Sequence, residues 1–587
     1  MDQGSVVSYE PVQPHWLYYD HVDSDGLWVP FSQYDSNNLN DAFNRVTEGQ
    51  EEVVATEGAH YDVLLTERIR RAAYWKEEPT SVRRGTWFYK GANDHHYIPY
   101  PESFSERLEL AFMEAMLQDQ WRKTVELPTG EVVILHNPKL ATPWPSVTSV
   151  DDWASTDHKN ACSVKRGMEN TGAEIPQGQP ETVDHLVFMV HGIGPACDFR
   201  FRTIISCASS FRHAARELVE THCRAARAGG RVGRVEFLPV DWHTPLHGNA
   251  TGVDNSPTYC QIILDTVATE LNRLHGLFCS RHPDFQGQVS LVGHSLGSLI
   301  LFDLLTNQVI GSGHPHSPED LGRGVTAILA PSPQSSGLSA TVSSMSSDGN
   351  QPTKFHRMRL ISSSVDNDSY DIGVGQVSIR YPQLSFNPYM LFALGSPIGM
   401  FLTVRGLRHI DPDYSLPTCK GFYNIYHPLD PVAYRVEPLI EPNTFMPPVL
   451  IPHIITKRIN LNFGQSVARL TTDLQHKMAS VLLYAWQYLS RRPSGRKLSI
   501  QSSSALQQQE SSTVPAQSER TNGISTGMLN RGRRIDYVLQ QTTMESINEY
   551  LFAIQSHLCY WESEDTVLLL LKEIYEESDI VFEDLPS

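Results

Sequence analysis

A buried strand, a tight turn and an apolar helix follow one another in QVSLVGHSLGSLILFDLL, residues 288–305. Gly293 and Gly297 stand two residues before and two residues after Ser295, which completes the pattern G-x-S-x-G. So sharp a turn from strand to helix leaves no room for larger side chains at these two places, and it exposes the serine hydroxyl. A short match can arise by chance, but the flanking strand and helix favour a nucleophile elbow with Ser295 as the nucleophile.

Apolar runs alternate with helical patterns in the sequence around this turn. HLVFMV (185–190) and RVEFLPV (234–240) are nearly continuous apolar runs, which is typical of parallel strands covered on both faces. Helices are expected over about 203–228 and 258–278. Strands that alternate with helices predict an α/β fold, and the elbow makes it an α/β-hydrolase fold with a mostly parallel sheet.

An acyl-transfer enzyme must stabilise the negative oxygen of its tetrahedral intermediate, usually with backbone N–H groups. The N–H of Leu296, at the start of the helix after the serine, is one candidate. The second is expected in the loop HGIG that follows the first strand, from Gly192 or Ile193. These three residues are the predicted oxyanion hole.

The acid and the base of an α/β-hydrolase follow the serine in that order. Asp430 stands in the proline-bracketed turn HPLDP, just after an apolar strand, where the acid is expected. His427 precedes Asp430 and gives the wrong order, whereas His557 stands just before the last apolar helix. We therefore expect His557 to take the proton of Ser295, Asp430 to orient the imidazolium, and an acyl-serine intermediate to form.

Two segments have the composition of disordered insertions. Residues 311–375 are rich in Ser, Gly and Pro, and residues 491–528 are rich in Ser, Gln and Arg. Neither has enough apolar residues to bury a core. The first divides the α/β region into two halves, 180–310 and 380–587, and the second lies inside the latter half.

The N-terminal region carries a weak internal repeat of an aromatic hairpin, a proline turn and an amphipathic helix. Its members are Pro30, Ser36, Leu39 and Phe43 in the first copy and Pro99, Ser105, Leu108 and Phe112 in the second. We expect a small α+β domain over 10–125 and a polar linker over 150–180. The domain is either an interaction module or a scaffold packed against the enzyme.

The composition excludes several classes of protein. A formal net charge of −19 argues against a nucleic-acid binder. Eight cysteines without a C-x-x-C pair indicate a reducing compartment, and they lack the spacing of a zinc site. The start of the sequence does not resemble a signal peptide, and no apolar run reaches about 18 residues. These features predict a cytoplasmic protein, for which any contact with lipid is expected from the cytosolic side.

Five segments resemble the DDHD-domain intracellular phospholipases A1, namely GHSLGSLILFDLLTNQ, LGSPIGMFLTVRGL, NIYHPLDPVAYRVEP, RIDYVLQ and SHLCYWESED. The likeness is greatest to the branch that acts as phospholipase and triacylglycerol lipase, and the N-terminal domain resembles its WWE region. The resemblance implies hydrolysis of the sn-1 ester of glycerophospholipids, with a preference for phosphatidic acid, and of triacylglycerol. It also implies work at endoplasmic reticulum and Golgi membranes, without a required cofactor.

The residues that give this family its name map onto Asp430, Asp536, His557 and Asp565. The resemblance also suggests a divalent metal at these four residues, as an alternative to a triad that needs no metal. In the metal-free interpretation, Asp536 braces the sheet edge and Asp565 caps the final helix.

Several alternatives stay open at this stage. Members of the family carry a SAM domain where this chain has residues 311–375, so phosphoinositide targeting through that domain is not expected. The amphipathic pattern over 467–489, followed by basic residues, predicts either a membrane-surface helix or a helix packed on the sheet. A non-catalytic scaffold of membrane trafficking is the alternative function. A protein partner of the WWE-like region and a homo-oligomer are further alternatives.

Overall fold

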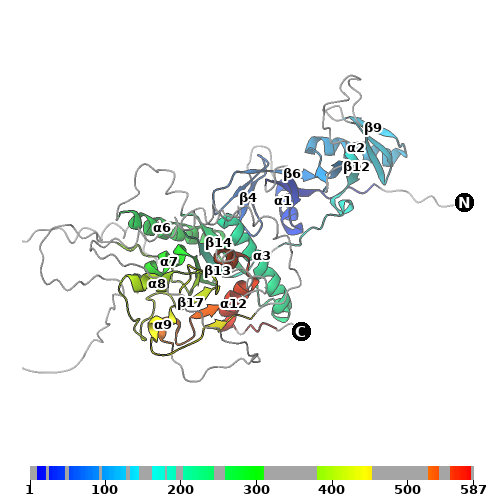
Figure 1. Ribbon diagram of the computed structural model, residues 1–587. Coiled ribbons are helices and arrows are strands. Elements are labelled where there is room, and N and C mark those ends of the chain that lie inside the picture. The colour runs from blue at the N-terminus through cyan, green and yellow to red at the C-terminus, as the bar shows by residue number, and fades with distance from the viewer. Residues whose placement is uncertain are drawn as a thin grey trace, which may run out of the picture. The chain divides into compact units, whose positions relative to one another are not determined.

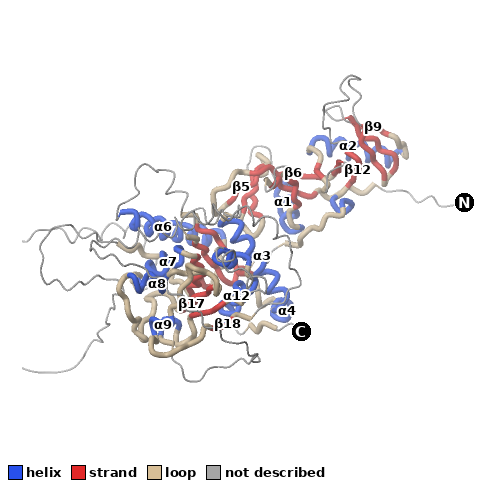
Figure 2. The backbone as a smooth tube through the Cα atoms, viewed as in Figure 1, coloured by secondary structure: helices blue, strands red, loops and turns tan. Residues whose placement is uncertain are grey.

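The structure is a computed structural model of the chain, drawn as a ribbon in Figure 1 and coloured by secondary structure in Figure 2. It divides into two compact units, Met1–Thr182 and Val183–Ser587. It describes residues 9–21, 26–45, 52–91, 96–126, 132–144, 161–178, 182–192, 203–242, 258–309, 380–452, 526–540, 555–578 and 580–583.

The N-terminal unit contains two six-stranded antiparallel sheets, each with one long helix. The first has the strand order β2-β1-β6-β5-β4-β3 and comprises β1 (His15–Asp20), β2 (Leu27–Pro30), α1 (Gln33–Arg45), β3 (Val53–Thr56), β4 (Tyr61–Leu64), β5 (Ile69–Ala72) and β6 (Thr80–Gly85). The second has the order β8-β7-β12-β11-β10-β9 and comprises β7 (Trp87–Gly91), β8 (Ile98–Pro99), α2 (Glu102–Gln118), β9 (Lys123–Glu126), β10 (Val132–Asn137), β11 (Leu140–Trp144), β12 (Ala161–Arg166) and the short helix η1 (Met168–Thr171).

Each sheet begins as the sequence repeat predicts. β1 pairs with β2, and β7 pairs with β8, in antiparallel hairpins that a helix follows. Trp16 and Trp87, the first aromatic residues of the two copies, are buried in separate hydrophobic cores. Leu39 of α1 and Leu108 of α2 are buried in the same two cores. The repeat therefore marks two equivalent folding units, each with its own core.

The predicted linker over 150–180 is wrong for its described part. β12 lies within it and pairs with β7 and β11 in the middle of the second sheet. Three strands of this sheet thus follow residue 125, the expected end of the domain. Further on, the carbonyl of Pro176 accepts a hydrogen bond of 2.8 Å from the N–H of Gln33, so the chain returns to the start of α1. Polar composition alone did not reveal these backbone pairings.

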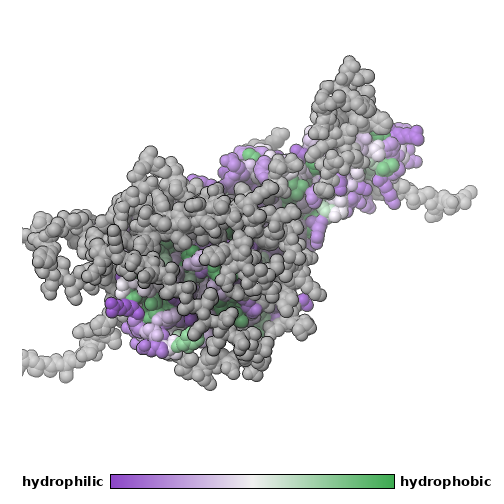
Figure 3. Space-filling view, in the orientation of Figure 1, coloured by the Kyte–Doolittle hydropathy of each residue, from purple (hydrophilic) through white to green (hydrophobic). Residues whose placement is uncertain are grey.

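An ion pair joins the two sheets of the N-terminal unit. Arg68, the residue before β5, donates from Nε and Nη2 to the two carboxylate oxygens of Glu102 on α2, at 2.8 Å each. Two parallel hydrogen bonds of this kind fix the orientation of both partners. On the face drawn in Figure 3, the described residues of this unit are mostly hydrophilic, with small hydrophobic patches between them.

The C-terminal unit is built on a seven-stranded sheet with the order β14-β13-β15-β16-β17-β19-β18, in which every pair is parallel. Its strands are β13 (Val183–Val190), β14 (Arg234–Val240), β15 (Gln288–His294), β16 (Met390–Leu394), β17 (Gly421–Tyr426), β18 (Val449–Leu450) and β19 (Asp536–Val538). The helices are α3 (Ile204–His222), α4 (Arg224–Ala228), α6 (Thr258–Arg281), α7 (Leu296–Thr306), α8 (Ile398–Val404), α9 (Glu437–Ile440) and α12 (Glu564–Tyr575). The predicted α/β architecture with a parallel sheet is confirmed.

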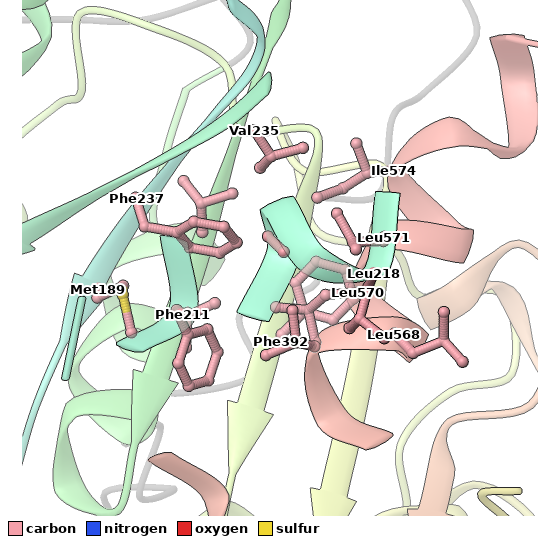
Figure 4. Packing of buried hydrophobic residues seen from close by; sticks show 14 of the residues in the cluster. Met189, Phe211, Leu218, Val235, Phe237, Phe392, Leu568, Leu570, Leu571 and Ile574 are labelled. Atoms are coloured by element: carbon pink, nitrogen blue, oxygen red, sulfur yellow. The ribbon is translucent and has the colours of Figure 1, made fainter. Parts of the chain in front are cut away.

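Helices cover both faces of the parallel sheet. α3 packs on β14 and on α12 on one face, while α6, α7 and α8 lie together on the other (Figure 1). Figure 4 shows the core under α3 and α12, where Phe211 and Leu218 of α3 meet Phe237 of β14, Phe392 of β16 and Leu570 of α12. A strand that is buried on both faces needs apolar residues throughout, which explains the continuous apolar runs of the sequence.

The strand order of the parallel sheet reverses direction next to the elbow. From β13 the chain goes to β14 on one side, and the later strands β15, β16 and β17 lie on the other. In open α/β sheets, ligands bind at the carboxyl ends of the strands where the strand order reverses, and in this sheet that position lies between β13 and β15. His191 and Gly192 follow β13, and Ser295 follows β15.

Some of the sequence predictions concern segments that the structure describes only in part or not at all. The predicted insertion over 311–375, almost all of 491–528 and the amphipathic pattern over 467–489 lie outside the described residues. The described end of the second insertion is ordered: Thr526 is buried, and the short helix η5 (Met528–Asn530) begins at Met528. Among the described helices, none has both the length and the apolar composition needed to cross a bilayer.

The position of Phe392 in the core generates a stability prediction. Phe392 is fully buried on β16, so Phe392→Ala should lower the free energy of unfolding of the C-terminal unit by about 3–5 kcal/mol through lost burial and a residual cavity. The matched control is Phe445→Ala, because Phe445 is 89% exposed and its truncation should change stability by less than about 0.5 kcal/mol. Thermal unfolding of both variants measures the difference, and equal shifts would contradict the proposed packing.

Candidate active site

Ser295 occupies a strained turn between β15 and α7. Its backbone angles are φ 54° and ψ −128°, a region that residues with a side chain rarely adopt. The N–H of Ser295 donates to the carbonyl of Leu394 at the end of β16, at 2.9 Å. Strain of this kind costs roughly 1–3 kcal/mol and persists where the surrounding structure holds it, often at functional sites.

The two glycines of the motif allow close backbone packing around this turn. A Cβ on Gly293 would lie 2.5 Å from the Cα of Ser298, and a Cβ on Gly297 would lie 2.5 Å from the carbonyl oxygen of Val190 on β13. Both distances are far below van der Waals contact. The turn from β15 to α7 can therefore pack against its neighbours only with glycine at both places.

Gly192 lies close to both Ser295 and Leu296. A Cβ on Gly192 would be 3.1 Å from the Cβ of Ser295 and 3.3 Å from the backbone nitrogen of Leu296. Leu296 is the first residue of α7, and the first N–H groups of a helix have no partner within it. Two of the predicted oxyanion residues thus border the serine, and Ile193 lies outside the described residues.

Asp430 and His557 form a buried hydrogen-bonded pair. His557 Nδ1 lies 3.0 Å from Oδ1 and 2.9 Å from Oδ2 of Asp430, and both side chains are almost fully buried. An ionised carboxylate can only accept, so Nδ1 carries the proton and Nε2 is left as the acceptor in the neutral ring. This is the tautomer that a general base needs in order to take a proton at Nε2.

Hydrogen bonds keep the Asp430 carboxylate ionised despite its burial. Oδ1 accepts from the N–H of Val432 at 2.9 Å, and Oδ2 accepts from the hydroxyl of Tyr560 at 2.7 Å. Burial by itself would raise the pKa of the Asp430 carboxyl, but the charge of His557 and these hydrogen bonds outweigh burial and lower it. Asp430 is therefore negatively charged at neutral pH.

Gly395 connects the serine to this pair. It follows Leu394, the acceptor of the Ser295 N–H, and has φ +54°. A Cβ on Gly395 would lie 2.7 Å from Asp430 Oδ2 and 3.2 Å from His557 Nδ1. Ser295, Asp430 and His557 therefore gather at the carboxyl ends of β15, β16 and β17. Among the described residues no hydrogen bond joins Ser295 to His557, and in free enzymes such contacts often tighten only with substrate.

Asp536 lies outside this group and binds within the sheet, on β19, whereas the edge strand is β18. It is fully buried at the start of β19 and accepts from Asn424 of β17 at 2.9 Å and from Arg435 at 3.0 Å. The N–H of Val436 donates to it at 3.0 Å. Asp536 thus ties two strands to the segment that follows Asp430.

Asp565 does not cap the final helix, contrary to expectation. Ser563 is the N-cap of α12, and its Oγ accepts from the N–H of Thr566 at 3.1 Å. Asp565 lies in the first turn, where a negative charge interacts favourably with the helix dipole. Among the described residues, which include all four signature residues, no group of three or more His, Cys, Asp or Glu side chains is arranged to hold a metal ion.

Sequence reasoning missed a buried carboxylate next to the site. Glu437 at the start of α9 is fully buried and binds the guanidinium of Arg534 through two hydrogen bonds, at 2.9 Å and 2.8 Å. The N–H of Ile535 donates to it at 2.8 Å. Burial raises the pKa of Glu437, but these partners outweigh burial and lower it. Only the fold brings Arg534 close, so no local pattern pointed to this pair.

Two further missed residues contact the Asp430–His557 pair. Tyr560 contacts Asp430, and His294 Nε2 lies 2.7 Å from the carbonyl oxygen of His557. A signal was present for each: His294 directly precedes Ser295, and Tyr560 stands three residues after His557, on the next helical turn. Neither signal identifies the contact, because the partners of His294 and Tyr560 are distant in the sequence.

The fold and the site define an α/β protein with a serine in a strand-to-helix turn beside a buried Asp–His pair. The DDHD domain matches residues 384–526 and 490–575, and WWE domains match residues 14–84 and 89–170. The chain is 44% identical to the triacylglycerol hydrolase DDHD2 of Mus musculus, over 100% of this chain and 96% of that protein. It therefore belongs to the DDHD family and carries WWE domains, which confirms the resemblance.

Two other relatives carry different names. The SEC23-interacting protein of Homo sapiens is 41% identical over 97% of this chain and 73% of its own length. The phospholipase SGR2 of Arabidopsis thaliana is 25% identical over 89% of this chain and 76% of its own length. No solved structure matches the chain.

The contacts of Gly395 generate a prediction for the site. Gly395→Ala should destabilise the C-terminal unit by about 2 kcal/mol or more, because the new methyl group meets Asp430 and the φ angle is positive. The matched control is Gly276→Ala in α6, where an added Cβ meets nothing within 4 Å. This control should be more stable by about 0.5–1 kcal/mol, since alanine favours a helix. Thermal unfolding checks both signs, and a neutral Gly395→Ala would contradict the close approach.

Proposed function

We propose that this protein is a serine hydrolase with an α/β-hydrolase fold that cleaves acyl esters of lipids. One observation carries the proposal: the buried His557–Asp430 pair lies at the same edge of the parallel sheet as Ser295 in its strained turn. The order of these residues in the chain is the order of α/β-hydrolases. Open α/β sheets bind their ligands at the carboxyl ends of the strands where the strand order reverses, and here these strands are β13 and β15.

In the proposed reaction, Ser295 Oγ attacks the ester carbonyl and His557 Nε2 accepts its proton. Asp430 keeps the imidazole in the required tautomer and stabilises its charged form. The N–H groups of Leu296 and of the Gly192–Ile193 segment stabilise the negative oxygen of the tetrahedral intermediate. His557 then protonates the leaving alcohol, and water hydrolyses the acyl-serine by the reverse steps.

The substrate class comes from the relatives. One is named a triacylglycerol hydrolase and another a phospholipase, which supports a glycerolipid ester as the substrate of this chain. Within that class we propose phospholipase A1 activity with phosphatidic acid as the preferred lipid, and triacylglycerol as a second substrate. No cofactor takes part in these steps. We place the protein in the cytoplasm, at the surface of endoplasmic reticulum and Golgi membranes.

A scaffold in membrane trafficking is the second candidate function. The observation in its favour is the 41% identity to a protein named SEC23-interacting protein, over nearly all of this chain. The WWE domains are the proposed site for a protein partner in that case. A scaffold does not require a base in the correct tautomer beside the serine, so the Asp430–His557 pair favours the hydrolase.

The test of the hydrolase is the removal of the Ser295 hydroxyl. Ser295→Ala should lower kcat by about 10⁴-fold or more, because serine and base act as a unit. The assay measures fatty acid released from mixed micelles of phosphatidic acid, phosphatidylcholine or triacylglycerol. Ser209→Ala is the matched control, since Ser209 is an exposed residue of α3 and its loss should leave the rate unchanged.

The same assay decides between the two functions. Activity that is lost in Ser295→Ala on one lipid establishes the nucleophile and the substrate together. Equal release by wild type and Ser295→Ala on every lipid would refute the hydrolase and leave the scaffold.

A further inference from the structure

The acid and the base of the site both lie on segments outside the sheet. Asp430 is on the loop that follows β17, and His557 is on a helical turn formed by residues 555–558. A reacting pair must be held to within a fraction of an ångström, and loops need side-chain contacts to reach that accuracy. Residues that hold these two segments together therefore have a direct bearing on the reaction.

The hydroxyl of Tyr560 forms hydrogen bonds with two residues of the loop that follows β17, His427 and Asp430. It lies 2.7 Å from Asp430 Oδ2 and 2.8 Å from the backbone nitrogen of His427, and the side chain is fully buried. A backbone N–H can only donate, so the hydroxyl oxygen accepts from His427. Its single proton is then directed at Asp430. Burial raises the pKa of Tyr560 well above 10, so this proton stays in place at neutral pH.

His294 contacts the backbone of His557. Its Nε2 faces the carbonyl oxygen of His557 at 2.7 Å, and a carbonyl can only accept, so Nε2 carries the proton. Burial, followed by the charge of His557, lowers the pKa of His294 to about 3, which keeps the ring neutral. The two imidazole rings lie 4.7 Å apart between centroids, and the indole of Trp561 lies 5.0 Å from His294.

We propose that Tyr560 and His294 are positioning residues for the acid–base pair: Tyr560 orients the Asp430 carboxylate, and His294 fixes the backbone of His557 relative to Ser295. The inference rests on the proposed function of the triad. Tyr560 stands on the segment that carries His557, and His294 is the residue before Ser295. The two contacts therefore link the serine, the acid and the base into one unit.

The first test removes only the hydroxyl of Tyr560. Tyr560→Phe should lower kcat for a short-chain soluble ester by about 10-fold to 100-fold, because the Asp430 carboxylate loses its orientation. KM should change little, because the substrate-binding site is unaltered. Labelling of Ser295 by a fluorophosphonate probe should slow by a similar factor. Labelling is measured at a temperature at which thermal unfolding shows Tyr560→Phe and its control variant to be almost fully folded, so that the rate constant reports the site and not the folded fraction.

The matched control is Tyr575→Phe. Tyr575 is a buried tyrosine of α12 whose hydroxyl donates to the carboxylate of Asp184 at 2.8 Å, away from the serine. Both variants lose a buried hydrogen bond to a carboxylate, and Tyr560→Phe also loses the bond from the His427 N–H, so Tyr560→Phe should lose somewhat more stability. Only Tyr560→Phe should lower kcat and slow the probe.

The second test distinguishes the hydrogen-bond donor of His294 from the space that its side chain fills. His294→Gln keeps an N–H group near the position of Nε2, whereas His294→Met fills the space without a donor. The glutamine variant should label with the probe at least about 10-fold faster than the methionine variant. Equal rates in these two variants would overturn the role of His294.

The outcomes also distinguish this inference from the proposed function. If Ser295→Ala keeps wild-type activity, the triad itself is wrong and the inference falls with it. If Ser295→Ala is inactive but Tyr560→Phe behaves like Tyr575→Phe, the triad stands and the positioning role of Tyr560 is overturned.

Discussion

The buried carboxylate of Asp430 is the group on which the rest of the site depends. A charge in a protein interior is costly unless hydrogen bonds and an opposite charge compensate for the lost water. Here His557, Tyr560 and the N–H of Val432 supply that compensation. Because His557 and Tyr560 come from one segment near the C-terminus, satisfying Asp430 also docks that segment against the loop after β17. The same contacts that satisfy the charge thus assemble the site.

The sheet supports this arrangement through a second layer of buried charges. Asp536 and Glu437 are fully buried and bind Arg435 and Arg534, together with backbone N–H groups of the neighbouring segments. These contacts connect β17 and β19 with the chain just after Asp430. Of the four residues predicted to be the family's signature, Asp430 and His557 form a buried pair, and Asp536 binds β17 and the segment after Asp430.

Much of the site was predictable because its determinants are local or follow chain order. Gly293 and Gly297 are required by a turn that is complete within one short stretch. Asp430 and His557 follow from the order of acid and base and from the strand and helix beside them. The predicted cap at Asp565 was wrong because Ser563, two residues earlier, offers a side-chain oxygen to the first turn. A cap is decided by the local backbone geometry, which residue type alone does not specify.

The sequence by itself determined the α/β region with its parallel strands, the repeat of two aromatic hairpins with helices, and the position of the serine turn. Each depends on hydrophobic periodicity or on steric limits within a few residues. Only the tertiary structure decided that Tyr560 and His294 hold the pair, that Gly395 lies against it, and that β12 completes the second N-terminal sheet. These contacts join residues far apart in the chain, and their partners are specified by how the elements pack in space, which no local pattern records.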